Sequence, residues 1–253
     1  SRLGENGKLF AFDQDLDALK NAIDDERFTL INENFRFIKR FLRFHGIKQV
    51  DGILADLGVS SHQFDVAERG FSTRFDAELD MRMNQKGDIS AYHVVNEYDE
   101  QDIARVLFDY GELKNARAMA NVIVTARKDK EIRNSDELKK VLAKFLPGHK
   151  SNKILAQIYQ AIRIEVNQEM DVLKEFLEQS LEVLNPKGRL SVISYHSLED
   201  RLVKRFMKNG MFQGEPERDF FGNFSVPFKI IGKLIVPDNE EIKLNNRARS
   251  AKL

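Results

Sequence analysis

The stretch VDGILAD at residues 50–56 predicts a strand over residues 50–55 that ends at Asp56. Two shorter apolar runs, at residues 8–12 and 28–31, precede it, and a further run follows at 189–194. Helical patterns lie between these runs, as at residues 35–44, where apolar side chains recur at helical spacing. Strands that alternate with helices predict a parallel sheet with right-handed crossovers.

The pattern is different between about residue 70 and residue 155, where no convincing strand is found. The helices predicted there are 99–108, 116–127 and 135–145. Apolar residues then recur every three or four positions from Ile158 to Leu184, which predicts one long helix that the turn at 185–188 ends. We therefore expect an open α/β sheet that is interrupted by helices.

The composition excludes several classes of protein. The 253 residues include 40 Lys and Arg and 40 Asp and Glu, so the formal net charge is zero, and the 42% hydrophobic content excludes a fully disordered chain. Cysteine is absent, which excludes disulfides and thiolate zinc sites and fits a reducing cytoplasm. No apolar run approaches the roughly 20 residues of a membrane span, so no membrane partner is expected. The five histidines are scattered, and no metal site is expected.

Ligands of open α/β sheets bind at the carboxyl ends of the strands, so the residues that follow each strand are candidates for a site. Asp13 follows the first strand, where a carboxylate can accept hydrogen bonds from the two hydroxyls of a ribose. Such a ribose belongs equally to a nicotinamide dinucleotide or to S-adenosyl-L-methionine. The alternative is a helix cap, a role that Asp15 or Asp17 can also fill.

The run DLGVSSHQ at 56–63 follows the central strand. Gly58 permits a close backbone approach or a positive φ angle, and Asp56 can accept a hydrogen bond from an amino group. A tight polar turn would explain the glycine and serines without a ligand, but the run is longer and more specific than such a turn requires.

The run SYHSLEDR at 194–201 follows the last strand and contains Ser, His and Asp. A hydrolase triad is rejected, because sequence neighbours rarely converge as a triad and no G-x-S-x-G elbow is present. Ser197 with Asp200 resembles the start of a helix. His196 is interpreted as a substrate contact or as a packed residue at the strand end.

Two segments are locally basic. Residues 114–133 hold six basic and two acidic residues, and residues 243–253 hold four basic residues and no acidic one. Such patches can contact RNA phosphates. For either patch alone a solvated surface is the preferred interpretation, and the Arg-Ala-Arg run at 247–249 could equally bind acidic side chains of the chain itself.

Taken together, five blocks resemble the RsmH (MraW) family of methyltransferases. The blocks are DGILADLGVSSHQFD at 51–65, ERGFSTRFDAELDMRMN at 68–84, QAIRIEVNQE at 160–169, SVISYHSLEDRLVK at 191–204 and NNRARSAKL at 245–253. They occur in the family's order and span nearly the whole chain, which makes the joint resemblance specific.

The resemblance implies an open, doubly wound, Rossmann-like methyltransferase sheet with an inserted all-helical domain. It assigns residues 1–69 and 156–253 to the methyltransferase domain and 70–155 to a helical insert for RNA recognition. It implies methylation, dependent on S-adenosyl-L-methionine, of the exocyclic N4 of a cytidine in the decoding region of 16S rRNA. The implied partner is the small ribosomal subunit in the cytoplasm, and the oligomeric state, a homodimer included, stays open.

The resemblance also implies roles for individual residues. Asp13, Phe35, Asp56 and Gln63 match cofactor-binding positions, with Asp13 at the ribose and Phe35 at the adenine. We expect Asp56, His196 and Ser197 to contact the reacting base. The RNA-binding candidates are Arg69, Arg74, Arg82, Arg247 and Arg249.

The chain departs from the family pattern in one respect. The family has an earlier strand and a glycine-rich turn, and this sequence is expected to begin after them. Two alternatives therefore remain beside the methyltransferase. One is a non-catalytic RNA-binding or ribosome-assembly protein, and the other is a nicotinamide-dependent oxidoreductase.

Overall fold

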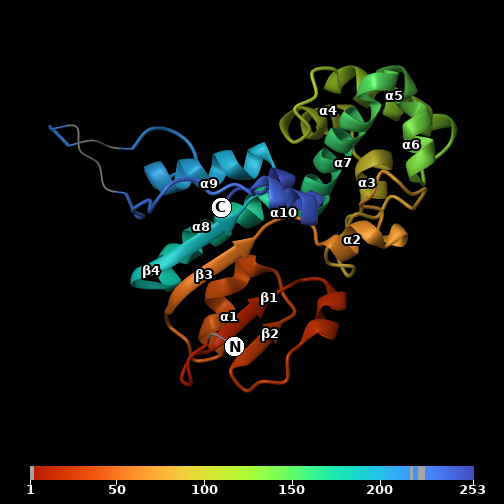
Figure 1. Ribbon diagram of the computed structural model, residues 1–253. Helices are drawn as coiled ribbons and strands as arrows, with labels where there is room; N and C mark the ends of the chain where they lie inside the picture. Colours follow the sequence, from red (N-terminus) through yellow and green to blue (C-terminus); the bar gives the residue numbers. More distant parts are fainter. Residues whose placement is uncertain (1–2, 217–218, 222–225) are drawn as a thin grey trace. The chain divides into compact units, whose positions relative to one another are not determined.

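The computed structural model describes residues 3–216, 219–221 and 226–253, and it has a mixed α/β fold with two pairs of parallel strands (Figure 1). The strands are β1 (Leu9–Phe12), β2 (Phe28–Ile31), β3 (Val50–Asp56) and β4 (Leu184–Ile193). β1 pairs with β2, and β3 pairs with β4. The prediction of parallel strands is confirmed. In the described residues, however, the strands form two separate two-stranded sheets rather than one.

β4 begins earlier than the predicted 189–194. Leu184 already pairs with Val50, and the next regular partners are Arg189 and Gly52. The intervening residues 185–188 form an irregularity within the strand, with Lys187 at a φ of 71°. The preceding helix ends before the NPKG sequence, as predicted. The NPKG residues themselves belong to a bulged strand and not to a separate turn.

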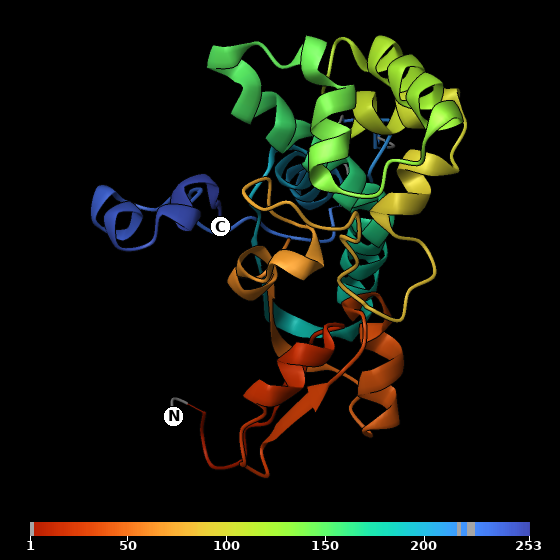
Figure 2. The same cartoon turned by 90° about the vertical axis from the view of Figure 1, so that its right-hand side faces the viewer.

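The contacts divide the chain into two compact units, and unit 1 consists of residues 1–58 and 170–253. Its helices are η1 (Leu16–Asn21), η2 (Phe35–Phe37), α1 (Ile38–Phe44), α9 (Ser197–Asn209), α10 (Asn239–Leu244), η6 (Asn246–Ser250) and nearly all of α8 (Glu169–Val183). α1 lies beside the β1–β2 pair (Figures 1 and 2), and Phe41 of α1 meets Phe12 of β1 edge to face. The buried core of this unit includes Ile38 and Leu42 of α1, Phe176 and Leu177 of α8 and Phe206 of α9.

Unit 2 consists of residues 59–169 and is built from helices. These are α2 (Ser61–Asp65), η3 (Ala67–Arg69), α3 (Ala91–Asn96), α4 (Glu100–Asp109), α5 (Ala116–Asp129), α6 (Ser135–Val141), η4 (Ala143–Phe145), η5 (Gly148–Lys150) and α7 (Ser151–Asn167). Apart from an isolated bridge between Glu78 and Asn134, this part of the described chain has no strand pairing. The three helices predicted at 99–108, 116–127 and 135–145 correspond to α4, to α5 and to α6 with η4.

Unit 2 extends beyond residues 70–155 on both sides. Val59 and Phe64, before residue 70, pack against the core of unit 2. Ile158 and Ile162, after residue 155, are fully part of that core. The sequence pattern marks where the helical spacing changes, whereas packing assigns these flanking residues to the unit.

The single long helix predicted from Ile158 to Leu184 is wrong. The structure breaks it at Gln168, which has a φ of 51° and ends α7 in the left-handed conformation. Asn167 supports the break, because its side chain bonds the backbone of Met81 and Met83. The apolar spacing continues across the break, so periodicity alone could not reveal it.

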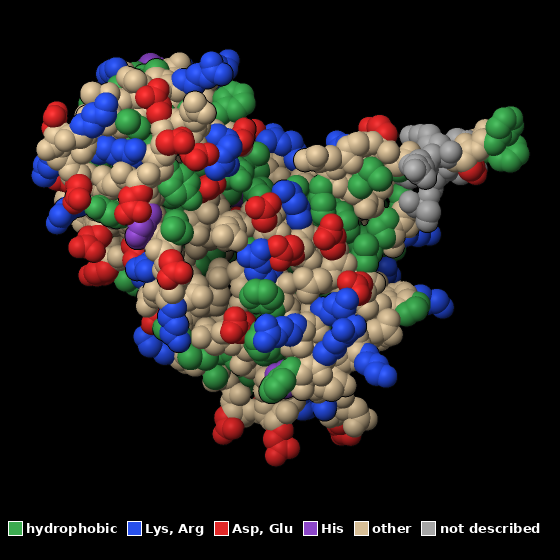
Figure 3. All heavy atoms as spheres, turned by 180° about the vertical axis from the view of Figure 1, so that it is seen from behind, with side chains coloured by type: hydrophobic (Ala, Val, Ile, Leu, Met, Phe, Trp, Pro, Cys, Tyr) green, Lys and Arg blue, Asp and Glu red, His purple; other side chains and the backbone are tan. Residues whose placement is uncertain are grey.

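In the described residues, no helix combines the length and the apolar content that a membrane span requires. The face drawn in Figure 3 carries Lys and Arg side chains interspersed with Asp and Glu, in keeping with the zero net charge.

Candidate functional site

The carboxyl ends of β1 and β2 are joined by side-chain hydrogen bonds. Asn32 Nδ2 donates to the backbone oxygen of Asp13 over 2.9 Å, and Asn34 Nδ2 donates to Gln14 Oε1 over 3.0 Å. Asp15, which is buried, caps the following η1 helix. The helix cap that was the alternative role for Asp13 is therefore supplied by Asp15. Asp13 is exposed, and its Oδ1 accepts a hydrogen bond from the backbone of Asp15 over 2.9 Å.

Phe35 lies four residues after the last residue of β2, Ile31, at the start of η2. Asn34 caps this short helix by accepting a hydrogen bond from the backbone of Arg36. The Phe35 ring is half-buried and meets the ring of Phe176 edge to face, with centroids 5.2 Å apart. Phe35 and Asp13 therefore lie at the joined ends of neighbouring strands, as the sequence predicted.

The ends of β3 and β4 are joined in the same way. The backbone of Leu57 donates to the oxygen of Ile193 over 3.0 Å, and Tyr195 Oη donates to Asp56 Oδ1 over 2.8 Å. Burial, followed by the hydrogen bond to Asp56, raises the pKa of Tyr195 to about 12. Sequence reasoning missed Tyr195. Its position directly after a strand, beside His196, was the signal that could have identified it.

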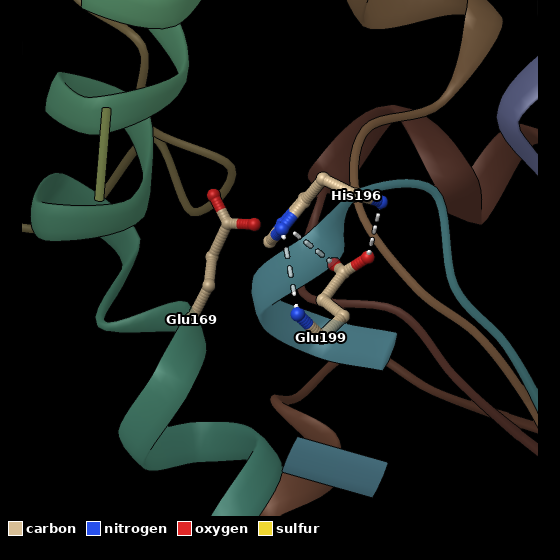
Figure 4. A group of neighbouring side chains, drawn as sticks. All are labelled: Glu169, His196 and Glu199. Atoms are coloured by element: carbon tan, nitrogen blue, oxygen red, sulfur yellow. Dashed lines mark hydrogen bonds and ion pairs between the residues drawn. The ribbon is translucent and has the colours of Figure 1, made fainter. Parts of the chain in front are cut away.

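His196 and Glu199 form the start of α9 (Figure 4). The Glu199 carboxylate is 2% exposed and accepts hydrogen bonds from the backbone of Tyr195 over 2.9 Å and of His196 over 3.3 Å. His196 Nε2 lies 3.2 Å from Glu199 Oε1. The predicted helix start at Ser197 and Asp200 is therefore wrong by one residue, because the capping box is formed by His196 and Glu199.

Gln63 is buried at the start of α2. Its Oε1 accepts a hydrogen bond from the backbone of Ser60, and Ser60 Oγ accepts one from the backbone of Gln63. This reciprocal capping box fixes the turn that follows β3. The structure thus gives the Gln63 side chain a local structural role in unit 2.

The three arginines expected to bind RNA have different surroundings within unit 2. Arg69 is 6% exposed and donates to the backbone oxygens of Arg82 and Met83. Arg82 forms a bidentate pair with Asp80 and also donates to Gly87. Only Arg74 of the three is well exposed, with 64% of its side chain accessible. Arg69 and Arg82 therefore hold loops of unit 2 together through these hydrogen bonds.

The basic C-terminal segment contacts the chain itself through Lys252. Its backbone exchanges two hydrogen bonds of 2.9 Å with Ser194, and its Nζ donates to Asp200 Oδ2 over 2.9 Å. Binding of the tail to an acidic side chain of the chain itself therefore holds for Lys252. Arg247 and Arg249 are exposed on η6.

A hollow of about 780 Å³ lies between α4 and α5 in unit 2. The lining residues include Arg105, Phe108, Lys114 and Arg117. Phe108 is 62% exposed, and Lys114 and Arg117 are exposed as well. Arg105 is paired with Glu165 over 3.1 Å. An exposed aromatic ring beside basic side chains is suited to a nucleotide base and its phosphate.

The family model of the MraW methylase family matches residues 1–253 of the chain. A relative from Flavobacterium johnsoniae is 81% identical over 252 residues, which cover 100% of this chain and 83% of the relative. Relatives from Flavobacterium psychrophilum and Bacteroides thetaiotaomicron are 74% and 53% identical, each over 100% of this chain and over 87% and 84% of their own length. All three are named ribosomal RNA small subunit methyltransferase H.

These matches define the class of the protein as a methyltransferase. Within that class, the chain belongs to the MraW methylase family. The resemblance of the five sequence blocks is thereby confirmed, and the two alternatives, a non-catalytic binding protein and an oxidoreductase, are not favoured.

Proposed function

We propose that this chain transfers a methyl group from S-adenosyl-L-methionine to the exocyclic N4 of a cytidine in the 16S rRNA of the small ribosomal subunit. The observation that carries the proposal is the 81% identity, over the whole chain, to a relative named for methylation of small-subunit rRNA. The choice of N4 and of the decoding region follows from the resemblance of the five sequence blocks.

The fold we propose for unit 1 is a doubly wound, Rossmann-like methyltransferase sheet to which both strand pairs belong. Phe10 and Phe12 of β1 and Ile53 and Val192 of the β3–β4 pair border one buried core, which supports this arrangement. Ligand-binding residues of such a sheet lie at the carboxyl ends of the strands. Unit 2 then serves as the RNA-recognition domain.

The residues at the strand ends fit the chemical groups of the cofactor. The exposed Asp13 carboxylate suits the ribose hydroxyls, the fixed ring of Phe35 suits one face of the adenine, and Asp56 suits the amino group of the methionine part. Gln63 follows Asp56 closely and shapes the same turn through its capping box. When bound, the cofactor supplies a methyl group on a positively charged sulfur.

The chain's own task is mainly to position the cytosine. Its exocyclic amine is a weak nucleophile, because the lone pair is delocalised into the ring, so alignment with the methyl group is the main requirement. Asp56 accepts a hydrogen bond from an amine and stabilises positive charge that develops there. His196 and Ser197 contact the edge of the base. The nucleotide must be unstacked to reach them.

We propose that RNA phosphates are held by the exposed basic side chains. In unit 2 these are Arg74 and the residues at the hollow between α4 and α5, Lys114 and Arg117. In unit 1 they are Arg247 and Arg249. Because the substrate is a ribosomal subunit, the place of action is the cytoplasm.

The test is a methyl-transfer assay. The chain is mixed with labelled S-adenosyl-L-methionine and undermethylated small ribosomal subunits, and the RNA is then digested to nucleosides. Label in N4-methylcytidine is the expected result. Label in another nucleoside would overturn the choice of N4. No label with a folded protein, repeated with the chain extended upstream, would overturn the methyltransferase proposal.

A further inference from the structure

The Tyr195 side chain links the end of β4 to Asp56, a proposed site residue at the end of β3. Its hydroxyl donates to Asp56 Oδ1 over 2.8 Å. Its ring lies against Gly58, where an added Cβ would be 3.9 Å from Tyr195 Cδ2. Among the described residues, Tyr195 is the hydrogen-bond partner that the structure gives to the Asp56 carboxylate, and Asp56 is exposed.

The backbone of Tyr195 is fixed on both sides. The buried Glu199 carboxylate accepts its N–H over 2.9 Å, and the preceding residue, Ser194, is held by its two backbone hydrogen bonds to Lys252. A side chain whose backbone is fixed in this way loses little further conformational entropy when it orients a neighbour. Tyr195 is therefore a prearranged donor rather than a mobile surface tyrosine.

The direction of the hydrogen bond follows from the protonation state of the phenol. Burial and the hydrogen bond to Asp56 raise the pKa of Tyr195 to about 12, so the phenol stays protonated at neutral pH. It therefore donates and does not act as a base. The acceptor in the pair is the Asp56 carboxylate, which has a second oxygen for another donor.

We infer that Tyr195 is a positioning residue for methyl transfer, because its hydroxyl engages Oδ1 of Asp56 and leaves Oδ2 oriented to accept a hydrogen bond from an amino group at the site. The inference rests on the proposed function. The amino group belongs either to the methionine part of the cofactor or to the cytosine. Both donors offer the same N–H chemistry, and binding and turnover measurements distinguish them.

The experiment compares Tyr195→Phe, Asp56→Asn and the double variant in methyl transfer to small ribosomal subunits. Tyr195→Phe keeps the ring against Gly58 and removes only the hydroxyl. We expect kcat/KM to fall about tenfold or more, as for the loss of a hydrogen bond to a charged group. If Tyr195 acts through Asp56, the double variant is no more than about twofold worse than Asp56→Asn alone.

Calorimetric binding of S-adenosylhomocysteine, which carries the same amino group, identifies the donor. If Tyr195→Phe binds the compound more weakly and retains kcat, the donor to Asp56 Oδ2 is the amino group of the cofactor. If binding is unchanged and kcat is lower, the donor is the cytosine amine. Either of these two outcomes supports the inference. Unchanged binding together with unchanged kinetics overturns it.

Tyr92→Phe is the matched control, because burial and then the nearby Glu131 carboxylate raise the pKa of Tyr92, as burial and Asp56 do for Tyr195, but within unit 2. This change is expected to leave kcat/KM unaltered. Ultraviolet titration of tyrosine ionisation gives a readout that does not depend on turnover. The ionisation that is missing in Tyr195→Phe belongs to Tyr195, and it should occur near pH 12 in the wild type. In Asp56→Asn the same ionisation should occur at lower pH. An inactive wild type would count against the proposed function, whereas an active wild type with an unaffected Tyr195→Phe would count against the inference alone.

Discussion

Lys252 Nζ donates a hydrogen bond to Asp200 Oδ2 over 2.9 Å and so joins the end of the chain to the first turns of α9. The backbone of the same lysine pairs with Ser194, directly after β4. Lys204 approaches Asp200 over 2.9 Å as well. The segment that carries Tyr195 and His196 is thus held between α9 and the C-terminal residues.

We expect Lys252→Ala to destabilise the protein by about 1 kcal/mol at pH 7, because it removes a charge-assisted hydrogen bond from a carboxylate that is largely buried. Burial raises the pKa of Asp200, but the hydrogen bonds from Lys204 and Lys252 outweigh it, and the net pKa is lowered. A lowered pKa in the folded state stabilises the protein above the unfolded pKa of about 4, and this stability is lost as the pH falls through the folded pKa. Urea unfolding of both proteins at several pH values should therefore show a difference at pH 7 that shrinks below pH 4. A difference that grew in acid would contradict this assignment.

Arg163 and Glu169 form a bidentate pair with distances of 2.7 and 2.9 Å, and their side chains are 13% and 9% exposed. We expect Glu169→Ala to cost about 3 kcal/mol, since it leaves a buried guanidinium without its charged partner. Urea unfolding measures the loss. The control is Asp171→Ala, whose pair with Lys174 is exposed and should contribute about 0.5 kcal/mol or less. Similar losses in the two variants would refute the distinction.

Replacing an exposed arginine of unit 2, Arg117 or Arg74, should weaken RNA binding, whereas replacing the buried Arg69 should not. Arg117→Glu at the hollow between α4 and α5 should weaken binding to small-subunit RNA and lower the slope of log K against log salt by about one, as expected for one lost phosphate contact. Arg74→Glu should act similarly. Filter binding at several salt concentrations is the measurement, and an unchanged slope in both variants would exclude this surface.

Arg69→Ala should instead reduce stability, by about 2 kcal/mol, because the buried guanidinium bonds the backbone oxygens of Arg82 and Met83. Thermal unfolding detects this loss, and circular dichroism identifies the samples that are still folded. In folded samples the salt slope should equal that of the wild type. A lower slope would return Arg69 to the RNA-binding surface.

Two glycines with similar backbone angles should respond differently to alanine. Gly70 has a φ of 70°, and a Cβ there would lie 2.5 Å from the backbone oxygen of Glu78. Gly58 has a φ of 85°, with 3.9 Å to its nearest neighbour, the Tyr195 ring. Gly58→Ala should cost about 1 kcal/mol from backbone strain alone, whereas Gly70→Ala should cost at least about 3 kcal/mol, because backbone must also shift. Equal melting temperatures for the two variants would contradict this difference.

The parts of the fold that follow local rules could be predicted. The strand at 28–31 was predicted with the limits it has in the structure, and the central strand differs by one residue. The helices near 99–108 and 116–127 were also found. Each depends on apolar periodicity and nearby caps, which are properties of neighbouring residues. The break at Gln168 could not be predicted, because it is stabilised by Asn167 bonding a loop more than eighty residues earlier.

The candidate site divides in a similar way. Asp13, Phe35 and Asp56 were predicted because they follow strands, and position along the chain is enough to place a residue at a strand end. Tyr195 and Glu199 were not among the candidates. The partner of Tyr195, Asp56, lies on the neighbouring strand β3. Glu199 belongs to a capping box that was predicted one residue too late.

The sequence by itself determined the family, the α/β alternation and the residues at the strand ends, since each of these is written in motifs or in local spacing. Only the tertiary structure decided which of the similar side chains face solvent and which hold the fold. Arg69 is buried while Arg74 is exposed, and Lys252 binds Asp200 while Arg249 is exposed. The physical reason is that burial and hydrogen bonding depend on chain segments distant in sequence, so similar side chains acquire different roles only when those segments meet.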